Sequence, residues 1–99
     1  MTADGAQQPT GWNDDERVRR WIVGARQREG QMAPISAELF AAADLQPGET
    51  VLDIGCGTGT TTTQAARLVG TSGHVTGSDL SPVMIDTARE SADGAREAA

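Results

Sequence analysis

The spacing of apolar residues predicts that the first part of the chain is helical. Apolar side chains recur three and four positions apart, as on one face of an α-helix, at Val18, Trp21, Ile22 and Ala25. Asn13 and Glu16 have the spacing of a capping box, and acidic residues fill the first turn. We therefore expect an amphipathic helix that starts after Asn13 and ends near Gly30.

A second helix is expected from Pro34, because proline is favoured in the first turn of a helix. Its apolar face would consist of Ile35, Leu39, Ala42 and Ala43. Pro47 and Gly48 then stop the helix. Residues 12–46 are thus predicted to form an N-terminal helical extension. Residues 1–11 lack apolar periodicity, and we expect them to be a disordered tail.

The apolar pattern changes after Gly48, and strands alternate with helices from there on. Residues 50–54 are a short run of strand-forming residues, which predicts a buried strand. A glycine-rich turn and a helix over residues 60–69 follow. Residues 74–78 predict a second strand. The next helix would begin with Ser81 as its N-cap, run to about Ser91, and leave the last residues frayed.

This order of elements predicts an α/β fold. Strands that alternate with helices pair in parallel. We expect a partial Rossmann-like parallel sheet in which residues 47–99 supply the first two β-α units of a truncated domain. Each of the two strands would then have one unpaired edge, open to a complementary chain or to self-association.

Composition narrows the possible partners and compartment. The chain has 99 residues, with 14 acidic and 8 basic side chains and a net charge of −6, which argues against nucleic-acid binding through positive potential. Its apolar runs are too short to span a membrane, and no leader is expected. The single Cys56 excludes an internal disulfide and a multi-cysteine zinc site. A cytoplasmic protein without a metal site is the expectation.

The segment after the first strand carries the clearest chemical signal. Gly55, Gly57 and Gly59 alternate directly before a helix, and glycines let the backbone turn sharply and approach a ligand closely. The N-terminus of the following helix suits a carboxylate or a phosphate. Asp79 ends the second strand, where parallel pairing brings it beside the loop and lets it accept from ribose hydroxyls. A nucleoside-containing cofactor is therefore implied.

The spacing of the loop distinguishes between two nucleoside cofactors. A dinucleotide fingerprint would place its third glycine at position 60, which is Thr60; the third glycine comes one residue earlier, at Gly59. Asp53 lies two residues before the first glycine, near the end of the first strand, and its negative charge repels a pyrophosphate and suits the ammonium group of an amino acid. Nicotinamide-dependent oxidoreduction is therefore disfavoured.

The sequence Asp-Ile-Gly-Cys-Gly-Thr-Gly at 53–59 resembles the glycine-rich signature of class I S-adenosylmethionine-dependent methyltransferases. Residues 77–85 are similar to the second motif of that family, and the resemblance is specific over residues 45–89. It implies that the cofactor, S-adenosyl-L-methionine, is held by eight residues. The methionine portion would contact Asp53, Gly55, Cys56, Gly57 and Gly59, the ribose hydroxyls Asp79, and the adenine ring Leu80 and Met84.

By this resemblance the chain is the N-terminal fragment of a methyltransferase that acts on a small-molecule acceptor. Family members have a larger sheet, and the usual substrate and catalytic positions fall in the later strands. Catalytic residues are therefore not identified, and the isolated chain is expected to be inactive. The alternative is a non-catalytic cofactor-binding or interaction module that needs a complementary chain.

Several side chains have a structural interpretation beside a functional one. Cys56 lacks the histidine partner of a cysteine nucleophile, so a small side chain between glycines explains it. The single His74 is expected to face solvent. Trp21 is expected to be packed, and Arg26 and Arg28 to lie on a solvated face, although all three could cap the active site or touch an acidic substrate.

Overall fold

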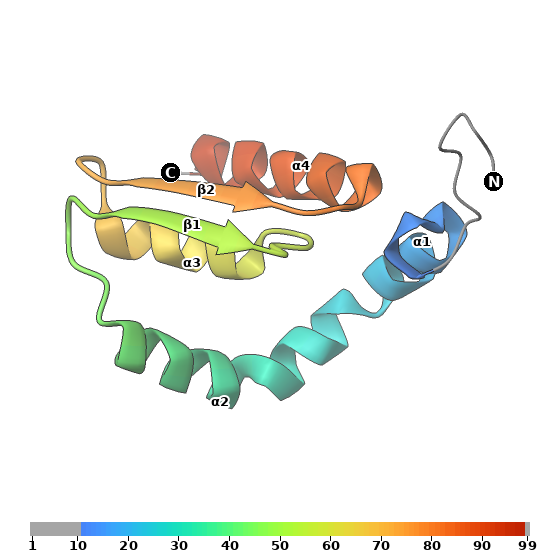
Figure 1. Cartoon of the computed structure of the whole chain (residues 1–99), viewed down its shortest axis with the longest axis horizontal. Coiled ribbons are helices and arrows are strands. Elements are labelled where there is room, and N and C mark those ends of the chain that lie inside the picture. The colour runs from blue at the N-terminus through green and yellow to red at the C-terminus, as the bar shows by residue number, and fades with distance from the viewer. Residues whose placement is uncertain (1–10, 99) are drawn as a thin grey trace, which may run out of the picture.

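The computed structural model describes residues 11–98 and the side chains of residues 11–92. The elements follow in the order η1 (Gly11–Asn13, a 3-10 helix), α1 (Asp15–Val23), α2 (Ala25–Ala43), β1 (Thr50–Ile54), α3 (Thr60–Val69), β2 (His74–Ser78) and α4 (Pro82–Ala98). This order confirms the predicted α/β class and the partial Rossmann-like arrangement (Figure 1). The predicted disordered tail lies outside the described residues except for Gly11, which instead opens η1.

The two strands form a parallel sheet. Thr50 pairs with His74 at one end and Ile54 with Ser78 at the other, as β-α-β order requires. α3 packs against this sheet through Ala65 and Val69, which are buried. Both strands and α3 have the predicted bounds, because Gly55 ends β1, Gly70 ends α3 and Gly73 precedes β2 in the sequence.

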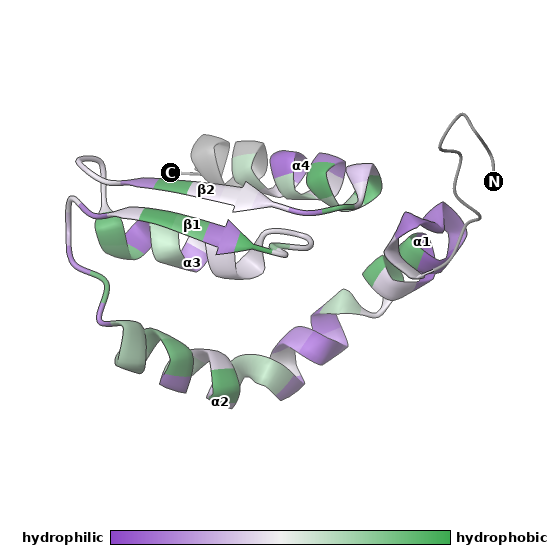
Figure 2. Cartoon of the chain, in the orientation of Figure 1, coloured by the Kyte–Doolittle hydropathy of each residue, from purple (hydrophilic) through white to green (hydrophobic). Residues whose placement is uncertain are grey.

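The prediction of a buried strand is wrong for one face of β1. Leu52 and Ile54 are 61% and 79% exposed, whereas the alternate residues of β1 are partly covered. Figure 2 shows that β1 is the more hydrophobic of the two strands. Side chains of a strand alternate between faces, and within residues 11–98 only the α3 side of this sheet is covered. His74 on β2 is exposed, as expected.

The predicted boundary between the first two helices is also wrong. α1 begins after Asp14, whose Oδ1 accepts from the backbone N–H groups of Glu16 and Arg17 at 3.1 and 3.3 Å. Asp14 therefore replaces Asn13 as the N-cap. The helix ends at Gly24 instead of Gly30, and α2 begins one residue later.

α2 continues through Gly30 and Pro34, where the sequence predicted a stop and a start (Figure 1). A proline ring in a helix approaches the carbonyl four residues earlier, which here belongs to Gly30. The predicted apolar face is mostly turned to solvent, since Ile35 and Leu39 are 60% and 56% exposed. The more covered side chains of this part of α2 are Ser36 and Phe40, which face α3 across a cavity.

α4 begins as predicted and extends further. Ser81 is fully buried, and its Oγ accepts from the backbone N–H of Met84 at 3.2 Å, as an N-cap does. The helix runs to Ala98 instead of ending near Ser91. Among residues 11–98, no helix combines the length and apolar character needed to cross a membrane.

Candidate functional site

The glycine-rich loop has the backbone conformation that its sequence suggested. Gly55, Gly57 and Gly59 have φ angles of 74°, 58° and 89°, in the left-handed region that glycine adopts most easily. A Cβ atom at Gly55 or Gly57 would meet nothing within 4 Å. The backbone of the loop is therefore open to a ligand. At Gly59, by contrast, a Cβ would lie 3.1 Å from Ala88, so this glycine lets α4 pack closely.

The end of β2 holds the loop, which confirms the predicted juxtaposition of Asp79 and the glycines. Asp79 Oδ2 accepts from the backbone N–H of Gly57 at 2.9 Å, and Oδ1 accepts from Ser81 N–H at 2.9 Å. The carbonyl of Ser78 also accepts from the N–H groups of Gly55 and Cys56, at 2.7 and 2.8 Å. The carboxylate thus lies at the loop, with one backbone donor on each oxygen.

Asp53 faces the first turn of α3. Its Oδ2 accepts from the hydroxyls of Thr61 and Thr62, each at 2.7 Å. The carboxylate therefore fixes the helix that follows the loop, and a negative charge near a helix N-terminus is favourable. Sequence reasoning did not identify these two threonines.

Cys56 is buried between the glycines and is only 8% exposed. Burial raises the pKa of its thiol, and the carboxylates of Asp53 and Asp79 raise this pKa further. A neutral thiol at neutral pH is a poor nucleophile. The side chain thus has a packing role, in line with the structural interpretation from the sequence.

A cavity of about 300 Å³, here called the Asp79 cavity, opens beside the loop. Its lining comprises Trp12, Trp21, Gly55, Gly57, Asp79, Leu80 and Met84. Leu80 is 89% exposed and Met84 only 4% exposed, so the leucine projects while the methionine packs mainly into the core. The structure therefore brings together five of the eight residues expected to contact the cofactor.

Two tryptophans complete the wall of the Asp79 cavity; the sequence left a place at the active site open for Trp21 and gave no role to Trp12. The rings of Trp12 and Trp21 meet edge to face, with centroids 5.1 Å apart and planes at 78°. Trp21 is 44% exposed and is not the packed residue that was expected. The helical spacing of Trp21 indicated a place on the core-facing side of α1, but its side chain lines the cavity together with Gly55 and Gly57.

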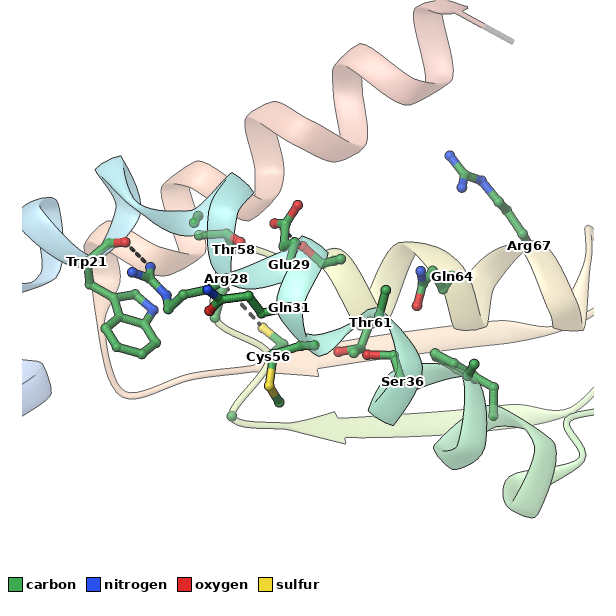
Figure 3. Close-up of a pocket in the computed structure, with 18 of the residues that line it drawn as sticks. Trp21, Arg28, Glu29, Gln31, Ser36, Cys56, Thr58, Thr61, Gln64 and Arg67 are labelled. Carbon is green, nitrogen blue, oxygen red and sulfur yellow. Dashed lines mark hydrogen bonds between the residues drawn. The ribbon is translucent and has the colours of Figure 1, made fainter.

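A larger cavity of about 980 Å³, here called the α2 cavity, lies between α2 and α3 (Figure 3). It shares Trp21, Gly55 and Gly57 with the Asp79 cavity. Apolar side chains line most of it, including Met32, Phe40 and Leu68. Its polar lining includes Arg28, Glu29, Ser36, Thr61, Gln64 and Arg67. Nothing in the sequence pattern indicated that α2 would enclose such a space.

Two polar features of the α2 cavity stand out. The hydroxyl of Thr60 donates to Glu29 Oε1 at 2.6 Å, which links α2 to the first residue of α3. Oε1 of Gln64 is buried and has no hydrogen-bond partner among the described residues. A buried oxygen of this kind is available to a donor from a ligand or from water.

Comparison with known proteins places these elements in a family. Residues 45–96 match a methyltransferase domain family, which covers more than half of the chain and includes the loop and both strands. The chain is 54% identical over 50 residues to an arsenite methyltransferase of Halobacterium salinarum, across 50% of this chain and 13% of that protein.

Two further relatives extend the match. The chain is 44% identical over 59 residues to aklanonic acid methyltransferase DauC of a Streptomyces species, across 60% of this chain and 27% of that protein. It is 47% identical over 59 residues to a probable cobalt-precorrin-6B C(15)-methyltransferase of Saccharolobus solfataricus, across 60% of this chain and 30% of that protein. The chain thus spans less than a third of the length of each of these relatives. By its glycine-rich loop, its β-α-β-α order and these matches, the chain belongs to the class I S-adenosylmethionine-dependent methyltransferase domain family.

Proposed function

We propose that the chain binds S-adenosyl-L-methionine at the glycine-rich loop and serves methyl transfer to a small-molecule acceptor. The hydrogen bond of 2.9 Å between Gly57 N–H and Asp79 Oδ2 carries this proposal. It joins the two motifs that the family resemblance identified, at the wall of the Asp79 cavity. The loop and the acidic end of β2 therefore act as one binding unit.

The residues around this bond fit such a cofactor. Each carboxylate oxygen of Asp79 accepts one backbone N–H, and a carboxylate oxygen has a second lone pair for a ribose hydroxyl. Leu80 and Met84 line the same cavity and would border the adenine ring. The open space beside Gly55 and Gly57 suits close approach of the methionine portion.

The chain contributes binding and orientation to the reaction. When bound, the cofactor supplies a methyl group on a positively charged sulfur, which makes the methyl carbon electrophilic. The loop and Asp79 would hold the cofactor in one orientation. Such alignment of the reacting groups lowers the activation free energy of a displacement reaction considerably. Cys56, with its neutral thiol, is not expected to compete for the methyl group.

The α2 cavity supports a small acceptor. Its volume of about 980 Å³ suits a small organic molecule, since pockets for such ligands hold about 300 to 1,000 Å³. Two similar proteins are named for small acceptors, arsenite and aklanonic acid. A cytoplasmic location is part of the proposal, because the single buried cysteine suits a reducing compartment.

Titration of the 99-residue chain with S-adenosyl-L-methionine tests the proposal. The chain contains two tryptophans and no tyrosine, and both tryptophans line the Asp79 cavity, so their fluorescence reports directly on this site. We expect saturable quenching that Asp79→Asn weakens at least tenfold. Asp86→Asn is the matched control, since Asp86 is an exposed carboxylate on α4.

Two results would contradict this function. One is absence of saturable binding by a chain whose circular dichroism shows the folded α/β content. The other is tighter binding of NAD than of S-adenosyl-L-methionine, which would favour the dinucleotide alternative.

A second candidate is a cofactor-binding module that works with a complementary chain. The exposure of Leu52 and Ile54 on one face of the sheet favours it, because adjacent exposed apolar side chains mark contact surfaces. Sedimentation of the chain over a range of concentrations, compared with a Leu52→Lys variant, tests whether this face associates. A concentration-independent monomer that binds the cofactor would exclude self-association through this face.

A further inference from the structure

Arg28 differs from the other arginines around the site in how it is held. Its guanidinium lies 3.5 Å from the ring centroid of Trp21 and donates a hydrogen bond to the carbonyl oxygen of that residue. Stacking on an aromatic ring orients the planar group. Figure 3 shows this pair at one end of the α2 cavity, on the side of Cys56 and the glycine-rich loop.

Arg28 also lacks a carboxylate partner among the described side chains. Arg20 and Arg89 form exposed ion pairs with Glu16 and Asp86, at 3.4 and 3.9 Å. No such pair is seen for Arg28 within residues 11–92, although it is only partly exposed. A guanidinium has five N–H donors, and the hydrogen bond to Trp21 uses one of them. The guanidinium of Arg28 can therefore donate further hydrogen bonds to an oxyanion of a ligand.

The other site near the loop that attracts an anion, the N-terminus of α3, is occupied by the carboxylate of Glu29. The N-terminus of α3 attracts negative charge, but Glu29 lies there and accepts from Thr60. A ligand carboxylate at that position would meet this like charge. Arg67 is the other cation of the cavity, but it lies in the last turn of α3, about 10 Å along the helix from Thr60 at 1.5 Å per residue.

We propose that Arg28, stacked on Trp21, binds the carboxylate of the amino-acid portion of the cofactor. This inference rests on the function proposed above and adds a residue from outside the glycine-rich loop and β2. It also gives α2 a role, since Arg28 lines the same cavity as the loop and brings a positive charge to the negative end of the ligand. The charge of Asp53 then remains for the ammonium group at the other side of the amino acid.

Two ligands that differ by one group test this inference. S-adenosylhomocysteine carries the carboxylate, and its decarboxylated analogue keeps the ammonium and adenosine but lacks the carboxylate. For the wild-type chain we expect about tenfold tighter binding of S-adenosylhomocysteine, equivalent to about 1.4 kcal/mol. Arg28→Gln should remove this difference by weakening S-adenosylhomocysteine alone. Arg26→Gln, an exposed arginine on the same helix, should leave both affinities unchanged.

A second variant tests the position of the guanidinium without removing its charge. A Cβ atom at Gly24 would lie 2.7 Å from Nη1 of Arg28. Gly24 has a negative φ that alanine tolerates, so Gly24→Ala should fold and displace the guanidinium from Trp21. We expect it to weaken S-adenosylhomocysteine severalfold and to leave the decarboxylated analogue unchanged.

The outcomes separate this inference from the proposed function. Equal affinity of the wild type for the two ligands, or equal weakening of both by Arg28→Gln, overturns the role of Arg28 and leaves cofactor binding in place. Wild-type affinity in Gly24→Ala overturns the requirement for stacking on Trp21. Failure of the folded wild type to bind either ligand overturns the proposed function and this inference together.

Discussion

The backbone N–H of Gly57 donates to Asp79 Oδ2 at 2.9 Å, across 22 positions of sequence. Because the same carboxylate accepts from Ser81 N–H, its charge supports both the loop and the start of α4. Hydrogen bonds to a charged acceptor are about twice as strong as neutral ones. We therefore expect Asp79→Asn to lower the free energy of unfolding by about 1 to 2 kcal/mol.

Urea unfolding without ligand measures this effect separately from binding. Asp86→Asn should stay within about 0.5 kcal/mol of wild type, because its ion pair with Arg89 is exposed. An Asp79→Asn variant as stable as the control would mean that the negative charge of Asp79 adds nothing to the two hydrogen bonds that it accepts.

Two glycine-to-alanine substitutions should have opposite effects on stability. A Cβ at Gly73 would lie 2.5 Å from the Cβ of Val69 and 2.7 Å from the carbonyl oxygen of Glu49, so the backbone before β2 must shift. Gly30 lies inside α2 with nothing within 4 Å of its added Cβ. We expect Gly73→Ala to cost about 2 kcal/mol or more, and Gly30→Ala to stabilise by about 0.5 to 1 kcal/mol. Thermal and urea unfolding of the two variants provide the comparison.

The hydrogen bond between Thr60 and Glu29 should control how tightly α2 stays on α3. Thr60→Val removes the donor and keeps the shape of the side chain. We expect severalfold faster amide exchange in the first half of α2, the change that loss of about 1 kcal/mol produces. Exchange in β1 should not change. Thr71→Val, in an exposed turn, is the control, and unchanged exchange in α2 would show that other contacts hold this helix.

Cys56 should make the free energy of unfolding decrease with pH above neutral pH. Burial, Asp53 and Asp79 raise the pKa of its thiol in the folded state, so the folded chain binds this proton more tightly than the unfolded chain. The stabilisation is complete below the unfolded pKa, about 8.5, and is lost as pH rises through the higher folded value. Between about pH 8 and pH 10 the wild type should lose more stability than Cys56→Ala. Parallel pH profiles for the two proteins would contradict the raised pKa.

The elements around the loop could be predicted because local chemistry determines them. Glycines bound β1 and α3 in the sequence, and Ser81 with Pro82 is a standard helix start. The position of Asp79 followed from parallel pairing alone. The contact between Asp79 and Gly57 is therefore a consequence of topology that a single sequence reveals.

The N-terminal helices could not be predicted as well, because tertiary packing decides their bounds. Gly24 ends α1, whereas Gly30 and Pro34 are accommodated inside α2. The pairs of Trp21 with Arg28 and of Glu29 with Thr60 depend on where α2 lies relative to α3, which no local pattern encodes. The exposure of Leu52 and Ile54 likewise depends on which layers cover the sheet.

The left-handed backbone at every second residue of the loop has a consequence for insertions and deletions. Gly55, Gly57 and Gly59 adopt positive φ, and the residues between them, Cys56 and Thr58, do not. Adding or removing one residue within the loop would move a side-chain-bearing residue into a left-handed position and a glycine out of one. Variation of this segment should therefore proceed by substitution of the intervening residues at constant length, so that the loop behaves as a fixed-length unit even where its composition changes.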